Sequence, residues 1–353
     1  MTPEQLVRPE ILALQAYHVS EAAGMVKLDA MENPYRLPAE IRAEMGVVLA
    51  EAQINRYPEP TGKELRELLR DKMRVPDGMD VLLGNGSDDL IQMVTFALAK
   101  PGAVVMYPEP TFIMYKLNAI LAGITPIGIP TRSDFSLDRE AFVNAVREHK
   151  PALVFIAYPN NPTGVLYDAG DIEAIISATD GLVVLDEAYH VFAQQSFMPR
   201  LNEFPNLAVI RTVSKLGLAG IRLGYLAGRP EWVREFNKVR QAYNVGVLTQ
   251  AAAMFVLGKL DVLEAQAAVI RSDRKVLHGG LAAMPGVTVY PSAANFFLVR
   301  VPDGVRTFEA LKAHGVLVRS FHGSHPMLEN CLRITVGTPD ENRTLLSAMR
   351  EAL

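Results

Sequence analysis

Short apolar runs alternate with amphipathic helical stretches between about residues 80 and 230 of this chain. This alternation is typical of βα units around a mostly parallel sheet, because each strand leads into a helix that packs on the sheet. Most of the runs are nearly continuous Val, Ile and Leu, as expected where helices cover both faces of the sheet. The runs that we expect to be strands are 81–83, 103–107, 153–157, 182–186, 208–212 and 223–227.

The pattern changes after about residue 260. A long helix is expected over 261–284, and shorter strands and helices follow it, which indicates a smaller α+β domain. The first 40 residues are interrupted by prolines, and we expect them to fold back onto this domain. The predicted divisions are an N-terminal arm with part of the small domain at 1–45, a large domain at 46–244, and a small C-terminal domain at 245–353.

Charge and composition make polyanionic partners and membranes unexpected. The formal net charge of −4 provides no bulk attraction to nucleic acid or anionic lipid. The longest stretch without a charged residue, 241–258, contains polar residues and falls short of the about 20 apolar residues that a membrane span needs, so we predict a buried helix there. The single cysteine, Cys331, cannot form an internal disulfide, which suits a reducing compartment such as the cytoplasm.

Polar residues follow the expected strands at their carboxyl ends, where open α/β sheets bind ligands. The first strand leads into Gly84-Asn85-Gly86-Ser87-Asp88-Asp89 and then directly into an expected helix, a typical anion site made of backbone N–H groups. Asp89 stands where a dinucleotide fingerprint needs its third glycine, and neither Gly-Lys pair of the chain has the spacing of a Walker A loop. These residues therefore favour a phosphate over a dinucleotide or a triphosphate.

Further chemistry follows the next strands. Phe112 could hold a ring over the crevice or simply plug the end of the sheet, and Asn160 and Asn161 place two amides after the 153–157 strand. Asp186 ends an apolar run, and a buried carboxylate is costly unless it meets a cation or several donors. An N-cap for the following helix is the simpler explanation of this acid.

A lysine follows the 208–212 strand in Ser214-Lys215, with Arg222 shortly after it. Such a lysine is either an ion-pair partner of Asp186 or a desolvated amine nucleophile. A carboxylate, an amide, a tyrosine, an aromatic ring and a phosphate cradle are expected at the same sheet edge. Pyridoxal 5'-phosphate needs this set, because it carries a pyridinium nitrogen, a phenolic oxygen, a phosphate and an aldehyde that reacts with amines.

Three motifs in this order resemble the class I and II aminotransferases of fold type I: 160–164 (Asn-Asn-Pro-Thr-Gly), 186–189 (Asp-Glu-Ala-Tyr), and Ser214-Lys215 with Arg222. The segments 32–35, 55–59 and 331–337 are similar to histidinol-phosphate aminotransferases, so the resemblance covers residues 32–338. It implies an α/β fold whose large domain holds a mostly parallel sheet of seven strands covered by helices, beside a smaller α+β domain. It also implies transamination of histidinol phosphate with 2-oxoglutarate, which yields glutamate, in histidine biosynthesis.

Two other enzymatic activities and a non-enzymatic role stay open on the sequence alone. An aromatic or broad-range aminotransferase could use the same arginines to hold a carboxylate. A phosphorylated-amino-acid decarboxylase on the same fold would release CO₂ without consuming a keto acid. The remaining possibility is a protein without enzymatic activity, either a cofactor-binding regulator or an inert domain with an ion pair between Asp186 and Lys215.

The resemblance assigns roles to the catalytic and ring-binding residues. Lys215 holds the cofactor covalently and, once the substrate amine displaces it, moves a proton between the substrate Cα and C4′ of the cofactor. Asp186 pairs with the pyridine nitrogen, and Tyr189 and Asn161 bind the phenolic oxygen. Phe112 stacks on the ring, at a position where a tyrosine is common in this group.

The other assigned residues bind the phosphate of the cofactor and the anionic ends of the substrates. The phosphate of the cofactor is held by Gly86, Ser87, Asp88, Ser214 and Arg222, and by Tyr57 of the neighbouring subunit, so the resemblance implies a homodimer with shared active sites. The spacing between Lys215 and Arg222 is one position shorter than is common in this family, so these roles require a tightened loop. The substrate site is assigned to Arg333, Arg319, Tyr17 and Asn33, and no metal is expected, since His322 and His325 lack further ligands.

Overall fold

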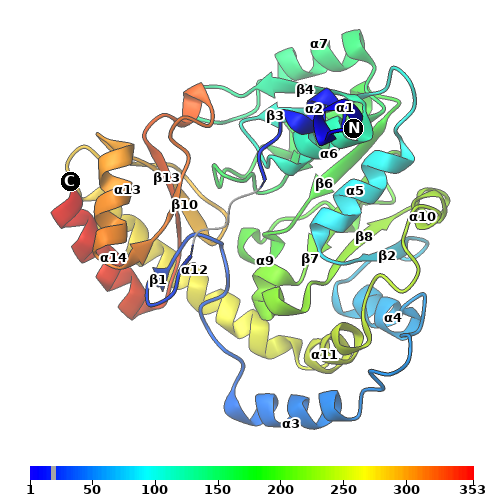
Figure 1. Ribbon diagram of the computed structural model, residues 1–353, viewed down its shortest axis with the longest axis horizontal. Coiled ribbons are helices and arrows are strands. Elements are labelled where there is room, and N and C mark those ends of the chain that lie inside the picture. The colour runs from blue at the N-terminus through cyan, green and yellow to red at the C-terminus, as the bar shows by residue number, and fades with distance from the viewer. Residues whose placement is uncertain (17–20) are drawn as a thin grey trace.

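A computed structural model describes residues 1–16 and 21–353 of the chain. Its largest sheet has seven strands in the order β2-β8-β7-β6-β5-β3-β4 (Figure 1). These strands are β2 (Asp80–Gly84), β3 (Val104–Glu109), β4 (Thr125–Pro130), β5 (Leu153–Ala157), β6 (Leu182–Asp186), β7 (Leu207–Thr212) and β8 (Gly224–Gly228). Five neighbouring strands pair in parallel, in the order β7-β6-β5-β3-β4. The strand β8 is antiparallel to both of its neighbours, β7 and β2. The predicted mostly parallel sheet is therefore confirmed.

One strand of this sheet was missing from the sequence-based set. The strand β4 has the sequence Thr-Pro-Ile-Gly-Ile-Pro and lies at the edge of the sheet. Prolines remove donors from the hydrogen-bond ladder, so they are tolerated at an edge, where one side of the strand needs no partner. The same prolines and the glycine hide the apolar pattern by which the other strands were found.

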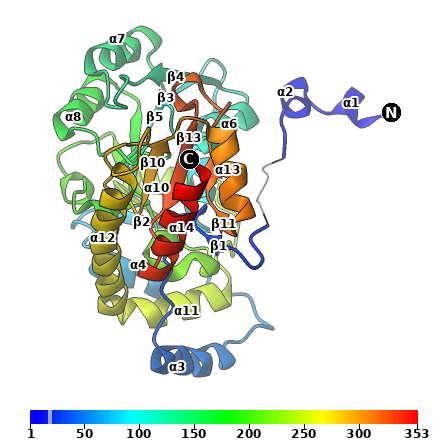
Figure 2. The same cartoon turned by 90° about the vertical axis from the view of Figure 1, so that its left-hand side faces the viewer.

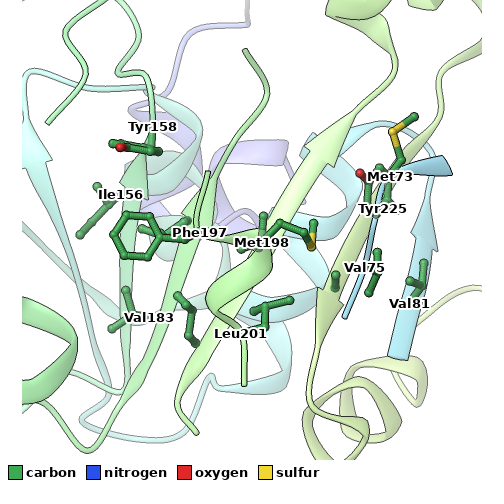
Figure 3. Close-up of a cluster of buried hydrophobic side chains, with 14 of the residues drawn as sticks. Met73, Val75, Val81, Ile156, Tyr158, Val183, Phe197, Met198, Leu201 and Tyr225 are labelled. Carbon is green, nitrogen blue, oxygen red and sulfur yellow. The ribbon is translucent and has the colours of Figure 1, made fainter. Parts of the chain in front are cut away.

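Helices cover both faces of the seven-stranded sheet. The main ones are α4 (Lys63–Lys72), α5 (Ser87–Ala97), α6 (Met114–Ala122), α7 (Arg139–His149), α8 (Ala169–Ala178), α10 (Pro230–Asn237) and α11 (Val247–Leu257). Successive side chains of a strand point to opposite faces. Val183 accordingly packs in one core cluster, with Ile156 and Phe197 (Figure 3), and Val184 packs in the cluster on the other face. Both faces are buried, which explains the continuous apolar runs.

A second, four-stranded antiparallel sheet lies to one side of the first, in the order β12-β13-β10-β9 (Figure 1). Its strands are β9 (Thr288–Val289), β10 (Phe296–Arg300), β12 (Arg319–Ser320) and β13 (Cys331–Thr335). The helices around it are α12 (Leu260–Ala282), α13 (Gly304–Ala313) and α14 (Pro339–Ala352). This α+β part has its own core cluster.

The N-terminal segment joins this α+β part through β1 (Val26–Lys27), which pairs in parallel with β11 (Val316–Leu317). Leu28 is buried in the same core cluster. The helices α1 (Pro3–Leu6) and α2 (Pro9–Leu12) protrude from the body of the molecule (Figure 2). The exact domain divisions at 45 and 244 stay a prediction.

The stretch predicted as a buried helix at 241–258 is helical only over α11, which packs on α3 (Ala39–Ala50) and α4. Ala252, Ala253 and Val256 of α11 are buried, whereas Leu248 is 48% exposed. The predicted helix is therefore present over a shorter range, 247–257, and it is buried along one side only. Within residues 1–16 and 21–353, no helix is long and apolar enough to cross a membrane.

Candidate active site

The carboxyl ends of β5, β6 and β7 meet at one edge of the large sheet, because these strands are parallel neighbours. A cavity lies at this edge, as expected for open α/β sheets. It is lined by Met31, Ser87, Asp88, Phe112, Ala157, Asn161, Asp186, Ala188, Tyr189, Thr212, Ser214, Lys215 and Arg222. The structure thus brings together most of the residues that the sequence assigned to the cofactor.

Asp186 is the last residue of β6 and is only 5% exposed. Its Oδ2 atom accepts a hydrogen bond from the Tyr115 hydroxyl at 2.9 Å, and its Oδ1 atom accepts one from the Ala188 N–H at 3.1 Å. Burial raises the pKa of Asp186 to about 6, although both hydrogen bonds lower it. No cationic side chain of the described residues forms a salt bridge with Asp186. The site therefore offers a buried carboxylate to a cationic or donor group of a ligand.

Lys215 lies in a π-helical turn, Ser214–Leu218, directly after β7. Its Nζ atom donates a hydrogen bond to the Ala30 carbonyl oxygen at 2.9 Å. Burial lowers the pKa of Lys215 to about 8, and the positive charge of Arg333 acts in the same direction. The proposed ion pair with Asp186 is not among the salt bridges of the described chain. Of the two interpretations of this lysine, the geometry favours the desolvated amine.

The phosphate cradle forms around the start of α5. Gly86 precedes the helix with φ of 89°, and a Cβ atom at this position would lie 2.6 Å from Arg222 Nη2. The Nη1 atom of Arg222 lies 3.5 Å from Ser214 Oγ, and Nη2 lies 3.7 Å from an Asp88 carboxylate oxygen. A helix N-terminus, hydroxyl groups and a guanidinium therefore face one point, which is the donor set that a phosphate needs.

The short spacing between Lys215 and Arg222 is accommodated by a tight loop. The π-helical turn is followed at once by a 3₁₀ turn, Ala219–Ile221, and Arg222 adopts a left-handed conformation with φ of 51°. This conformation reverses the chain, so Arg222 returns to Ser214 and lines the same cavity.

The residues expected around the phenolic oxygen also lie together. The Asn161 amide donates a hydrogen bond to the Tyr189 hydroxyl oxygen at 3.2 Å and accepts one from Arg333 Nη1 at 2.6 Å. These contacts fix the orientation of the amide. Arg333 belongs to β13, and its Nη2 atom also donates to the Asp29 carbonyl oxygen at 2.8 Å, so it connects the two sheets at the cavity.

Three other predicted substrate and cofactor residues, Arg319, Asn33 and Tyr57, are not part of the lining of this cavity. Arg319 is opposite Arg333 in the β12–β13 register and lines a neighbouring cavity that shares Phe112 with the first. The Asn33 amide nitrogen donates to the Leu216 carbonyl oxygen and to Gln266, and its substrate contact stays a prediction. Tyr57 is 80% exposed and stacks on Tyr243, and Tyr17 lies outside the described residues.

The sequence did not indicate a buried ion pair behind the site. Glu187 is fully buried and lies 2.9 Å from Arg211 of β7, and it also accepts hydrogen bonds from Ser196 and from the Phe197 N–H. The acid next to Asp186 was the only available signal, and its partner is 24 residues away. This network holds the chain segment that follows Asp186.

We expect Arg211→Met to lower the free energy of unfolding by about 3–5 kcal/mol, because it leaves the Glu187 carboxylate buried without its cation. Adding Glu187→Gln to this variant should recover part of the loss by removing that charge. Urea unfolding of the two single variants and the double variant measures the coupling. Additive effects would contradict the importance of the pair.

Comparisons with known proteins identify the family. The model of the family described as aminotransferase class I and II matches residues 23–349. Histidinol-phosphate aminotransferase 1 of Ralstonia nicotianae is 56% identical over 99% of this chain and 95% of its own length. The corresponding enzyme of Chromobacterium violaceum is 53% identical over 99% of this chain and 98% of its own.

A solved structure shows the same fold. Histidinol-phosphate aminotransferase from Sinorhizobium meliloti, in complex with pyridoxal-5'-phosphate, superimposes with a TM-score of 0.87 at 25% identity, over 98% of this chain and 97% of that one. The fold predicted from the resemblance is thereby confirmed. The chain belongs to the class I and II aminotransferase family, in the group of the histidinol-phosphate aminotransferases.

Proposed function

We propose that this protein transfers the amino group of L-histidinol phosphate to 2-oxoglutarate, with pyridoxal phosphate as its cofactor, in histidine biosynthesis. The products are imidazole-acetol phosphate and glutamate. The observation that carries the proposal is one cavity in which a desolvated lysine, a buried carboxylate that has no salt bridge within the described chain and a phosphate cradle meet. The similarity to enzymes named for this substrate supports the choice of amino donor.

The residues of the cavity fit the cofactor. Asp186 would face the pyridine nitrogen, since a buried carboxylate that already has two donors still needs a positive charge. Gly86, Ser87, Ser214 and Arg222 would hold the phosphate. When it is bound, the cofactor supplies an electron-withdrawing ring that stabilises the negative charge left on the substrate Cα after deprotonation.

The residues of the chain supply proton transfer and orientation. The Nζ atom of Lys215 would take the proton from the substrate Cα and pass it to C4′ of the cofactor. Taking the proton requires the amine in its neutral form. Tyr189 and Asn161, which already lie within hydrogen-bond distance of each other, would both bind the phenolic oxygen. Arg333 and Arg319 would bind the anionic ends of the substrates, the phosphate in one half-reaction and a carboxylate in the other.

The test is a steady-state assay of the purified protein with histidinol phosphate and 2-oxoglutarate, in which glutamate is measured. Free aromatic and aliphatic amino acids serve as competing donors at the same concentrations. We expect kcat/KM to be highest for histidinol phosphate. Turnover with the free amino acids alone would contradict the proposal, and CO₂ release without a keto acid would indicate the decarboxylase instead.

The pH dependence of cofactor uptake tests the role of Lys215. Since the pKa of this lysine is lowered to about 8, the neutral amine forms as the pH rises through 8, well below the range of an exposed lysine. We expect the rate at which the cofactor-free protein takes up pyridoxal phosphate to increase with pH around this value. Stopped-flow absorbance measures the rate, and a midpoint near 10 would contradict a desolvated lysine.

We also propose a homodimer in the cytoplasm, in which Tyr57 contributes to the site of the partner subunit. The exposed Tyr57 and Tyr243 rings support a contact surface there. The single cysteine, Cys331, is free in the structure, which supports a reducing compartment.

Mixing two variants, each lacking one residue of the proposed shared site, tests whether the site is shared. A dimer of one Tyr57→Ala chain and one Lys215→Ala chain has one site with both residues intact if Tyr57 acts across the interface. We expect activity to return when the two variants are unfolded and refolded together. No recovery, in dimers shown by sedimentation to be mixed, would place Tyr57 outside the partner's site.

A further inference from the structure

Tyr115 is a fully buried residue beside the cavity to which the sequence assigned no role. It lies in the first turn of α6 and has no solvent exposure. Its ring stacks on Phe155 of β5 with 4.7 Å between the centroids and 8° between the planes. The ring of Phe112 meets it edge-on at 5.8 Å. The two contacts leave the Tyr115 ring little freedom, so the direction of its hydroxyl is fixed by packing.

The hydroxyl of Tyr115 donates to Asp186 Oδ2 at 2.9 Å, and the Ala188 N–H donates to the other carboxylate oxygen. The two donors come from different elements, α6 and the loop after β6. Because each carboxylate oxygen accepts one hydrogen bond, the carboxylate cannot rotate about its Cβ–Cγ bond without breaking a hydrogen bond. Of the two, only the tyrosine contact comes from a side chain.

We infer that Tyr115 is the positioning residue of Asp186: its hydroxyl fixes the plane of the carboxylate and keeps it ionised for the pyridine nitrogen of the cofactor. The inference rests on the proposed function, because it requires Asp186 to face that nitrogen. Phe112, assigned to stack on the ring, touches Tyr115. A single tyrosine therefore links the residue against the ring face to the residue at the ring nitrogen.

The charges around Asp186 explain why its ionisation needs support. Besides burial, two acidic side chains raise the pKa of Asp186: Asp88 of α5, and Glu187 in the loop that follows β6. The Tyr115 hydroxyl is the largest influence that lowers it, ahead of the Ala188 N–H. The remaining ionisable groups of the cavity are Lys215, Tyr189 and Arg222. Loss of the hydroxyl therefore moves the pKa upward from about 6, toward a carboxyl group that is protonated at neutral pH.

The test is Tyr115→Phe, which removes the hydroxyl and keeps the ring between Phe112 and Phe155. The matched control is Tyr167→Phe, since Tyr167 is also buried, at 3% exposure, and its hydroxyl has no hydrogen-bond partner in the described chain. A hydrogen bond to a charged group contributes enough for its loss to cost roughly tenfold to hundredfold. We expect Tyr115→Phe to lower kcat by this factor with KM for histidinol phosphate within about twofold of wild type.

Two readouts separate positioning from a merely structural role. The first is the dissociation constant of pyridoxal phosphate, which we expect to increase about tenfold in Tyr115→Phe and to stay unchanged in Tyr167→Phe. The second is the ¹⁵N NMR shift of cofactor labelled at the pyridine nitrogen, followed with pH in the loaded protein. We expect the labelled nitrogen to lose its proton at a lower pH in Tyr115→Phe than in wild type.

The outcomes distinguish the inference from the proposed function. If the wild-type nitrogen titrates as in free cofactor, Asp186 does not face it and the site assignment itself fails. If the wild-type nitrogen is held protonated and Tyr115→Phe leaves its titration unchanged, the site assignment stands and the role of Tyr115 is overturned. Equal losses in Tyr115→Phe and Tyr167→Phe would also overturn it, because they would show a general effect of removing a buried hydroxyl.

Discussion

Lys215→Ala is expected to lower kcat for transamination by at least about 10³-fold. Proton transfer by a positioned side chain contributes about 10²- to 10⁴-fold, and this variant also loses the amine to which we assign the covalent link to the cofactor. The other basic side chains that the structure describes near the cavity are Arg222 and Arg333, whose guanidinium groups are donors and do not take a proton from Cα.

Two measurements check this prediction. Borohydride reduction followed by mass spectrometry should leave the cofactor on the peptide that contains Lys215 in wild type and on no peptide in the variant. The control is Lys238→Ala, which removes an exposed lysine that pairs with Glu235 and should keep wild-type activity. A Lys215→Ala protein with more than about a tenth of wild-type kcat would refute the assignment of this lysine as the acid–base group.

The strands that carry the site could be predicted because burial on both faces leaves an unbroken apolar run. For β5 and β6 the predicted and observed bounds agree to the residue. Position at the end of such a strand is then enough to place Asp186 and Asn161 at one edge. Local sequence therefore predicts which residues reach the site when each of them follows its own strand.

Contacts between distant segments could not be predicted in this way. Tyr115 reaches Asp186 across 71 positions, and Arg333 reaches Asn161 across 172. Nothing near Tyr115 in the sequence distinguishes it from a core tyrosine, since its role depends on how α6 sits on the sheet. Asn33 shows the same limit, because its hydrogen bonds to Leu216 and Gln266 join segments 183 and 233 positions away, and its substrate contact stays a prediction.

Asp186→Asn is expected to lower kcat by about 10²- to 10⁴-fold. Removal of one partner from a buried ion pair costs about 3–5 kcal/mol, and each 1.36 kcal/mol corresponds to tenfold in rate. Asparagine keeps the shape of the side chain: its amide oxygen can accept from the Ala188 N–H, and its amide nitrogen can donate to the Tyr115 hydroxyl oxygen. The loss should therefore exceed that of Tyr115→Phe, which leaves an ionisable carboxyl group at position 186 and removes only one of its two donors. Steady-state kinetics of both single variants and the double variant test this order.

The same substitution should make the cofactor-free protein more stable. Burial raises the pKa of Asp186 from 3.8 to about 6, so the folded state binds a proton more tightly than the unfolded state. The folded state accordingly loses stability as the pH rises from about 4 to 6, and above 6 the full cost of the buried charge remains, about 3 kcal/mol. Asparagine carries no such charge. Urea unfolding at pH 7.5 should show Asp186→Asn more stable than wild type without cofactor, and the difference should vanish near pH 4. A variant that is less stable at both pH values would mean that the carboxylate serves the fold, whereas greater stability with lost turnover is the signature of a charge kept for the ligand.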